Sequence, residues 1–411
     1  MKVFKLPQLH WYKGQDLEVY FPEAWEVNYY PMMGFNSSPI NSKDIKRVLR
    51  NPINCKPLSK LIEGKREVAL VVDDITRPTK AYQILKLIVN ELKGISPDAI
   101  RIIVALGAHG ACYRSQLTKK LGESILNQYA VYLHNPFYGN EKIGETTFGT
   151  PIEVNSEYYY RDLKIGLGCI VPHPGAGFGG GSKIVLPGIA SFNSIYHFHG
   201  IVEGRREGKR KPNTGWGKVK DNPMRKDMEE FTNKVGLDMK IDVIVNGKGD
   251  TVKVFAGNHL DEFMEGVKYA RDHYSTKVEG NFDVIIANVY AKANEAVLGF
   301  INWRWKLKDK GTFVLIANAP EGQIPHYMMG TFGKKFSAPL RSKLTSTQKI
   351  VILSKYKVLD PWLPINENLL WVKDWKEVLE EIKNNHKEPR VAIIPNADIQ
   401  CSYEILKEES S

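Results

Sequence analysis

The stretch VALVVDDITRPTKAYQILKLIVNELKGISPDAIRIIVALGAHG, residues 68–110, decides the fold. It contains two short apolar runs, at 68–72 and 100–106, and the apolar residues between them recur at helical spacing over 82–92. Strands that are apolar throughout are typical of a parallel sheet covered by helices on both faces, because such strands have no side that faces solvent. The pattern therefore predicts a βαβ unit and an α/β fold.

Similar patterns continue along the chain and predict two domains. They indicate further strands at 129–133, 164–171, 241–246, 251–255, 282–288, 312–317, 349–353 and 391–395, and helices at 222–235, 260–271 and 375–384. We expect each domain to be a largely parallel sheet flanked by helices, over residues 1–276 and 277–396, with a tail at 397–411 that packs back on the first domain. Parallel sheets bind ligands beyond the carboxyl ends of their strands, so we expect the active site in the cleft between the domains.

The composition is that of an ordinary globular protein. The 411 residues are 43% hydrophobic and 25% charged, and no apolar stretch is long enough to cross a membrane. No apolar run with a small-residue cleavage site occurs near the N-terminus, so we expect a cytoplasmic protein without membrane contact. The four cysteines (Cys55, Cys112, Cys169 and Cys401) are far apart and predict neither a disulfide framework nor a structural zinc site.

A formal charge of +11 favours anionic partners, either acidic metabolites or nucleic acid. The densest basic run, at 205–212, lies among Gly, Pro and Asn residues and is typical of a solvated loop. We therefore expect a small anionic substrate and no nucleic-acid partner, with nucleic-acid binding as a minor alternative.

Two predicted strands end in polar residues. Asp73, Asp74, Thr76 and Arg77 follow the first strand of the βαβ unit, and Arg77 offers a planar fork of donors for a carboxylate or phosphate. The alternative is a capped turn in which Arg77 pairs with Asp73. His109 follows the next strand among small residues, as a candidate acid or base or as a structural histidine.

The glycine-rich stretch PHPGAGFGGGSKIVLPG, residues 172–188, is the most informative segment. Its glycines permit close approach to a ligand, and their amides can hold a phosphate. It is not a P-loop, because Ser182 precedes Lys183 instead of following it. A pair of histidines, His197 and His199, follows this stretch. Two histidines alone make a poor zinc site, so a prosthetic group would have to supply the other metal ligands. Alternatively, one histidine of the pair has only a structural role.

In this combination the sequence resembles the nickel-dependent lactate racemase family. The matched elements are, in order, Asp74-x-x-Arg77, Gly107-x-His109, His173-Pro, Lys183-x-x-x-Pro187-Gly188 and His199. The resemblance runs from about residue 68 to residue 199 and is weaker across the second domain. It implies a racemase or epimerase of a 2-hydroxy acid that acts by proton-coupled hydride transfer through a 2-keto acid.

The resemblance also implies a cofactor, a nickel-pincer nucleotide made by separate biosynthetic proteins. Lys183 would link covalently to it, His199 would complete the nickel coordination, and the segment Asp74, Ile75, Thr76 and Arg77 would contact it. His109 and His173 match the catalytic pair, in which one histidine removes the hydroxyl proton and the other supplies a proton. Arg77 is in addition a candidate ligand for the substrate carboxylate.

The sequence departs from the lactate-specific members in the second domain. Their polar Gln-x-x-Lys pair aligns with Leu298 and Ile301, and Gly110 replaces an arginine often found after the first catalytic histidine. We therefore expect a substrate other than lactate, with Lys292 or Arg304 binding a second anionic group. Phe300, Trp303, Arg304 and Trp305 would line a larger pocket, although an aromatic stripe at helical spacing more often packs in a core.

Two function classes remain. The first is the racemase or epimerase, for which Lys183 and His199 are the discriminating residues. The second is a non-racemising protein that binds a pincer nucleotide or another phosphorylated nucleotide, and the presence of both His109 and His173 argues against it. The sequence is compatible with an oligomer.

Overall fold

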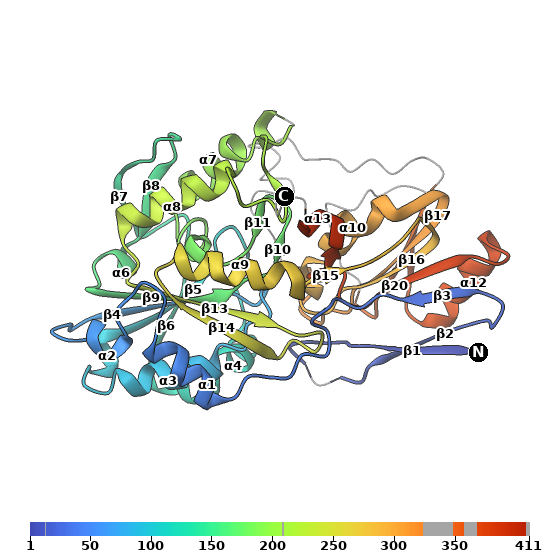
Figure 1. Ribbon diagram of the computed structural model, residues 1–411. Coiled ribbons are helices and arrows are strands. Elements are labelled where there is room, and N and C mark those ends of the chain that lie inside the picture. The colour runs from blue at the N-terminus through green and yellow to red at the C-terminus, as the bar shows by residue number, and fades with distance from the viewer. Residues whose placement is uncertain (13, 208, 324–347, 357–367, 408–411) are drawn as a thin grey trace.

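The computed structural model describes residues 1–411 except Lys13, Gly208, 324–347, 357–367 and 408–411. The described residues form two lobes, each built on a six-stranded sheet (Figure 1). The first sheet consists, in spatial order, of β14 (Thr251–Gly257), β13 (Met239–Val245), β9 (Leu163–Cys169), β4 (Val68–Asp73), β5 (Ile100–Ala105) and β6 (Ala130–Leu133). The second consists of β19 (Leu369–Val372), β18 (Lys349–Leu353), β17 (Leu307–Ile316), β16 (Phe282–Asn288), β20 (Arg390–Ile394) and β3 (Glu26–Tyr29).

The first sheet is parallel except at one edge, where β14 pairs antiparallel with β13. The side chains of β4 alternate between two cores. Val68 and Val72 pack with α1 (Ser42–Arg50), α3 (Tyr82–Glu91) and α9 (Asp261–His273). Ala69 and Val71 pack with α7 (Phe192–His197) and α8 (Pro223–Val235) on the other face. Because both faces are covered, these strands are apolar throughout, as the sequence indicated.

All strands of the second sheet run parallel. Ile285 and Ala287 of β16 pack with α10 (Val297–Trp303), and Val284 and Ile286 pack on the opposite face with α12 (Trp375–Asn385). The two parallel-rich sheets flanked by helices confirm the predicted α/β fold class.

The second lobe also contains the N-terminal strands, which the sequence analysis did not predict. Strand β3 pairs with β20, and the antiparallel pair of β1 (Lys2–Leu6) and β2 (Leu17–Phe21) adds Leu6, Val19 and Phe21 to the core beside α12. The domain division at 276 remains a prediction; in the structure, β3 pairs with β20, a strand near residue 390.

The C-terminal tail lies against the first lobe. Strand β21 (Cys401–Ser402) pairs with β15 (Ser275–Thr276), and Leu406 of α13 (Tyr403–Lys407) enters the core that contains α9. Arg271 of α9 donates a hydrogen bond to the backbone carbonyl of Leu406 at 2.6 Å. The chain therefore passes between the lobes more than once.

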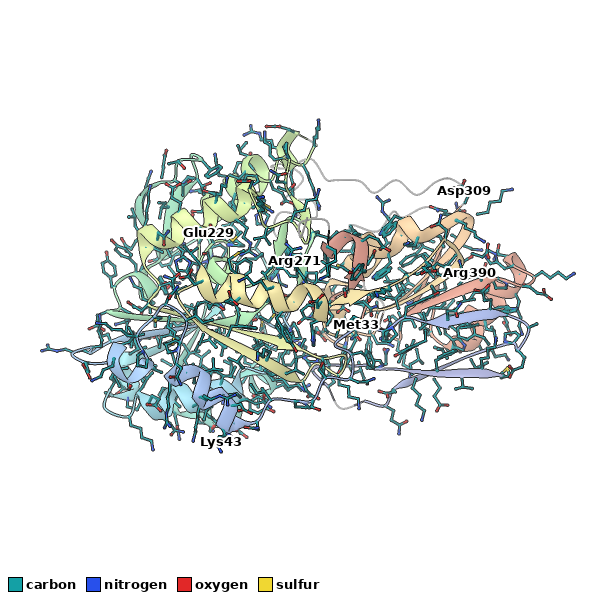
Figure 2. All side chains as sticks on the ribbon, viewed as in Figure 1. Met33, Lys43, Glu229, Arg271, Asp309 and Arg390 are labelled. Carbon is teal, nitrogen blue, oxygen red and sulfur yellow. The ribbon has the colours of Figure 1, made fainter. Side chains whose placement is uncertain are left out.

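Most predicted strands and helices agree with the structure within about two residues, and β17 is the clearest difference. It begins at Leu307, five residues before the predicted strand, because Lys308, Asp309 and Lys310 are exposed and give no apolar signal. The Asp309 side chain points away from the second lobe, as Lys43 does from the first (Figure 2). Among the described residues, no helix is long and apolar enough to cross a membrane.

Candidate active site

A cavity of about 480 Å³ lies between the lobes, at the carboxyl ends of β4, β5 and β9. It brings together residues that are far apart in the sequence. The predicted site residues that line it are Asp74, Arg77, His109, His173, Lys183, His199, Lys292 and Arg304. Ile75 and Thr76 do not line it: Ile75 packs in the core, and the Thr76 hydroxyl donates a hydrogen bond to Asp74.

Asp74 holds His109 in a defined orientation. His109 Nδ1 lies 2.6 Å from Asp74 Oδ2, while Asp74 Oδ1 accepts hydrogen bonds from the Thr76 backbone N–H and hydroxyl. Burial alone would raise the pKa of Asp74, but His109 and Arg77 lower it to about 2, so the carboxyl group is ionised. His109 Nδ1 can therefore donate a hydrogen bond to this carboxylate.

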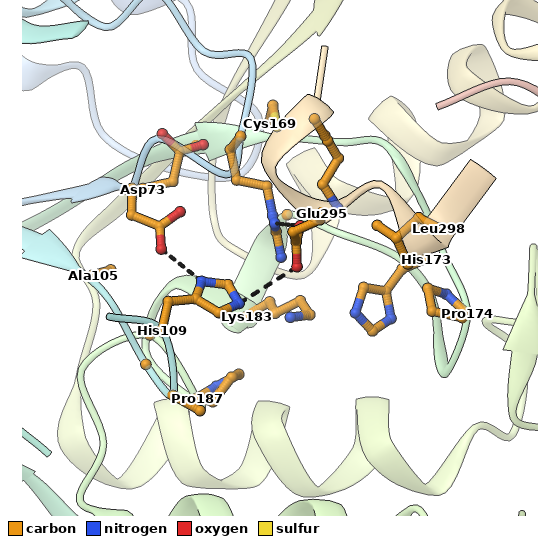
Figure 3. A pocket seen from close by; sticks show the side chains of 18 of the residues that line it. Asp73, Ala105, His109, Cys169, His173, Pro174, Lys183, Pro187, Glu295 and Leu298 are labelled. Carbon is orange, nitrogen blue, oxygen red and sulfur yellow. Dashed lines mark hydrogen bonds and ion pairs between the residues drawn. The ribbon is translucent and has the colours of Figure 1, made fainter. Parts of the chain in front are cut away.

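His173 lies at the turn of a small hairpin. Strand β10 (Pro172–His173) pairs antiparallel with β11 (Ala176–Phe178), and Gly177 has φ +75°. A Cβ atom at Gly177 would lie 2.3 Å from the carbonyl oxygen of Lys218, so glycine is required there. The hairpin thereby holds His173 on one side of the cavity, next to Leu298 (Figure 3).

Arg225 of α8 holds the backbone of the glycine-rich segment in place. Its guanidinium group is buried and donates hydrogen bonds to three carbonyls of the segment, those of Ala176, Phe178 and Gly180. Charge-assisted hydrogen bonds of this kind are stronger than neutral ones. The segment between His173 and Lys183 is therefore a rigid support for both side chains.

Lys183 extends from the short helix η2 (Gly181–Ile184) between His109 and His173 (Figure 3). Burial, and then the positive charges of Arg77 and Arg225, lower its pKa from 10.5 to about 7. A large fraction of the amine is consequently neutral at physiological pH. A desolvated lysine beside other cations is an activated nucleophile.

His199 presents one nitrogen to the cavity. It lies in η3 (Phe198–Val202), and its Nδ1 lies 3.0 Å from the carbonyl oxygen of Ile195, so Nδ1 carries the proton. Burial and the nearby Arg205 lower its pKa to about 3, which keeps the ring neutral. A neutral imidazole whose Nδ1–H is bound to a carbonyl has the form in which histidine binds metals through Nε2.

Glu295 lies at the centre of the site, although the sequence analysis did not select it. Its Oε2 lies 2.8 Å from an Arg77 nitrogen and 2.6 Å from Lys292 Nζ, and its Oε1 lies 3.6 Å from His109 Nε2 (Figure 3). Burial alone would raise its pKa, but Lys292, Arg77 and His109 together lower it. Glu295 is therefore an ionised counter-ion for residues of both lobes.

Comparison with known proteins shows a similarity to lactate racemases. Residues 12–209 match the model of the lactate racemase N-terminal domain. Lactate racemases from Thermoanaerobacterium thermosaccharolyticum and Lactiplantibacillus plantarum are 28% and 29% identical to this chain over 285 and 290 residues. Residues 12–209 of this chain are therefore similar to the N-terminal domain of lactate racemases.

The similarity covers about two thirds of the sequence and nearly all of the fold. The matched segments cover 68% of this chain and 66% of each relative, just under two thirds. The solved structure of the Thermoanaerobacterium lactate racemase apoprotein superimposes with a TM-score of 0.74 at 21% identity, over 98% of this chain and all of that one. A crystal structure of a Thermotoga maritima protein gives a TM-score of 0.64 at 17% identity, over 89% of this chain and 99% of that one. At these identities the superpositions establish the fold.

One wall of the cavity is apolar. Leu298 and Ile301, the positions that the sequence analysis compared with a polar pair of lactate-specific members, both line it. Of the four residues considered for a larger pocket, only Arg304 lines it. Phe300 and Trp303 are buried in the core of the second lobe, as the alternative expectation held, and Trp305 is largely exposed.

The basic run at 205–212 is the main correction to the sequence analysis. We expected a solvated loop, but Arg205 and Arg210 line the cavity. Arg205 Nε lies 2.7 Å and Arg210 Nε 3.8 Å from oxygens of the fully buried Glu203. Glu203, which lies outside the basic run, pairs with both arginines and holds them at the cavity. The composition of the run alone does not reveal this partner.

The donors in the cavity fit a cofactor that brings most of its own metal ligands. Among the described residues, no group of three or more His, Cys, Asp or Glu side chains could hold a metal ion. His199 Nε2 can supply one imidazole ligand, and the nearby Lys183 amine can attach an organic group. Soft sulfur donors together with imidazole suit Ni(II), so these residues fit a nickel-pincer nucleotide.

Proposed function

We propose that this protein is a racemase or epimerase of a small 2-hydroxy acid other than lactate, acting with a nickel-pincer nucleotide through a 2-keto acid. One observation carries the proposal: a single cavity contains the nucleophilic Lys183 amine, the metal-binding form of His199 and the Asp74–His109 pair. The resemblance to lactate racemases supports the same function.

Residues of the first lobe would hold the cofactor. Lys183 would form the covalent link, because its low pKa supplies a neutral amine at physiological pH. His199 would bind nickel through Nε2, with Nδ1 fixed on the Ile195 carbonyl. When bound, the cofactor would accept the α-hydrogen of the substrate with its electron pair and return it.

His109 would move the hydroxyl proton. Asp74 would stabilise the imidazolium ion that forms when His109 takes up the proton. General acid–base catalysis by such a group typically contributes about 10²–10⁴-fold in rate. His173 would contact the substrate from the other side of the cavity.

The substrate would be an acid with an apolar side chain. Leu298 and Ile301 offer that side chain an apolar wall, and Arg304 on the same side of the cavity is a candidate for its carboxylate. Lys292 and Arg77 are less suited to that carboxylate, because both already pair with Glu295.

The test is production of the protein together with the cofactor-assembly proteins, followed by intact mass and nickel analysis. We expect a covalent nucleotide adduct with about one nickel per chain, since the proposed site is single. Lys183→Arg keeps a cation but cannot form the link, and should lose the adduct. Lys164→Arg, which changes a lysine outside the cavity, is the matched control and should keep it.

The loaded protein is then incubated with single enantiomers of 2-hydroxy acids, and the products are separated by chiral chromatography. Racemisation that depends on Lys183 supports the proposal. An unmodified wild type, when a lactate racemase loads under the same conditions, would refute it. An adduct without racemisation of any 2-hydroxy acid would favour the non-racemising nucleotide-binding protein.

A further inference from the structure

The backbone just before Lys183 is held by Asp242 of β13. The peptide that joins Gly180 to Gly181 is bound at both of its polar groups: the Gly181 N–H donates to Asp242 Oδ2 at 2.6 Å, and the Gly180 carbonyl accepts from Arg225. A Cβ atom at Gly180 would lie 2.7 Å from Asp242 Oδ2, so glycine lets the carboxylate reach the backbone there. Asp242 therefore fixes the turn from which the Lys183 side chain extends.

Next to Asp242 lies a second carboxyl group, that of Glu262 on α9. The Glu262 side chain is fully buried and within hydrogen-bonding reach of Asp242. Among the described residues, no N–H or O–H group donates to either of its oxygens. The two nearby cations direct their hydrogen bonds elsewhere. Lys240 Nζ lies 2.5 Å from Asp242 Oδ1, and Arg225 donates to carbonyls of the glycine-rich segment.

These surroundings favour a neutral Glu262. Burying an ionised carboxylate without donors is far more costly than burying a neutral carboxylic acid. The charged groups that face it are Asp242 and Lys240 on β13 and Arg225 on α8. Burial, followed by the charge of Asp242, raises the pKa of Glu262 well above its ordinary value, and the two cations oppose this only in part. Adjacent carboxyl groups avoid repulsion by sharing one proton, and Asp242 already has two donors, so the proton belongs to Glu262.

We propose that Glu262 is a positioning residue: as a neutral acid it donates a hydrogen bond to the Asp242 carboxylate, and the pair fixes the turn that carries Lys183. The inference concerns the support of this lysine and rests on the proposed function only for what Lys183 does. A hydrogen bond from a neutral acid to a carboxylate is short and strong. It holds the Lys183 side chain in its buried position between His109 and His173.

The next residue of α9, Phe263, supports the same turn by apolar contact. Its ring would lie 2.9 Å from a Cβ atom at Gly181, and the Arg225 guanidinium lies over it, with Cζ 3.9 Å from the ring centroid. The first turn of α9 therefore contacts the glycine-rich segment through a polar and an apolar side chain. A change at Glu262 can reach Lys183 by this route, through the backbone.

The pH dependence of stability tests the protonation of Glu262 without activity. Between the ordinary pKa of a glutamate, 4.5, and the raised pKa of Glu262, the folded protein holds a proton that the unfolded chain has released. The wild type therefore loses stability as the pH rises through this range, whereas Glu262→Gln, which keeps a neutral donor, does not. We expect the melting temperature of the cofactor-free variant, relative to wild type, to rise steadily from about pH 5 to about pH 8.

Glu265→Gln, at an exposed position of the same helix, is the matched control and should show no such rise. A difference for Glu262→Gln that stays level or falls with pH would overturn the proposal, since an ionised Glu262 gives no rise. If Glu262→Gln does not fold, the infrared spectrum of wild type labelled with ¹³C-glutamate decides. The carbonyl band of a protonated glutamate should persist at about pH 8, and its absence would overturn the proposal.

Acylation of Lys183 by an amine-selective reagent tests the positioning role. Glu262→Gln retains the hydrogen bond to Asp242 and should keep the midpoint of the reaction near pH 7. Glu262→Leu is of similar size but cannot donate, so Lys183 should become more exposed to water. Its midpoint should then rise, with about tenfold less acylation at neutral pH.

An unchanged midpoint in a folded Glu262→Leu variant would show that Glu262 does not position Lys183. Should the leucine variant fail to fold, the melting series and the infrared spectrum still decide whether Glu262 is the donor. If the loaded wild type racemises no 2-hydroxy acid, the proposed function fails, while these measurements on cofactor-free protein keep their meaning.

Discussion

At the residue scale, the chemistry of Lys183 differs from that of an isolated lysine. Burial and neighbouring cations lower its pKa to about 7, so its neutral fraction rises as the pH rises through that value. An amine-selective acylating reagent should therefore modify Lys183 with a midpoint near pH 7, whereas lysines exposed to solvent titrate near 10.5.

Peptide mass spectrometry after short labelling pulses measures this reaction one site at a time. Lys220, outside the cavity, serves as the internal reference, and Lys183→Arg should remove the low-pH site. If Lys183 reacted only in the range of the reference lysine, the interpretation of its amine as a nucleophile at neutral pH would be wrong.

The resemblance selected Lys183 and His199 because both belong to local sequence motifs, and both line the cavity. Glu295 has no such pattern, because its role depends on Arg77, which lies 218 residues earlier in the chain. Arg205 and Arg210 were assigned to a loop because their partner Glu203 lies outside the basic run.

At the scale of elements, α10 gives the cavity an apolar wall, which we propose contacts the substrate. Leu298 and Ile301 of this helix line the cavity at the positions where we expect Gln and Lys in lactate-specific members. The double variant Leu298→Gln with Ile301→Lys should therefore shift kcat/KM from substrates with an apolar side chain towards lactate, by about tenfold or more.

The measurement is kcat/KM for two 2-hydroxy acids that differ in the size of an apolar side chain. Trp305→Lys, which adds a cation to an exposed residue just beyond α10, is the control and should leave the ratio unchanged. An unchanged ratio in the double variant would show that this wall does not contact the substrate.

The sequence predicted elements best where both faces of a strand are buried. Strands β4, β5 and β16 are continuous apolar runs and were all predicted, because tertiary packing and local pattern agree there. The N-terminal strands were missed because they are short and partly exposed, and because β3 has its partner near residue 390. A pattern within one segment contains no information about such a partner.

At the scale of the whole molecule, the N-terminal segment is part of the second core. Leu6, Val19, Phe21 and Trp25 are almost fully buried there, and burying one such side chain contributes about 1.5–3 kcal/mol. Together they approach the usual stability of a domain, about 5–15 kcal/mol. A chain that lacks residues 1–30 should therefore lose the fold of its second lobe.

Hydrogen exchange with mass spectrometry distinguishes the lobes in this truncated chain. We expect β16 and β17 to lose protection while β4 and β5 keep it. The control is the full chain with Val3→Ser, a change at an exposed position of β1. Protection of β16 in the truncated chain would show that the second sheet folds without its N-terminal strands.

The pairing of β3 with β20 also affects the order in which the protein can fold during synthesis. Glu26 and Arg390, joined by a 2.8 Å ion pair across these strands, lie 364 residues apart. At the usual speed of translation, the N-terminal strands leave the ribosome roughly 20 to 70 s before their partner is made. The first lobe can fold in that interval, while the apolar side chains of β1 and β2 remain uncovered. The nascent chain should therefore need a chaperone at its N-terminal segment until the last strand of the second sheet is complete.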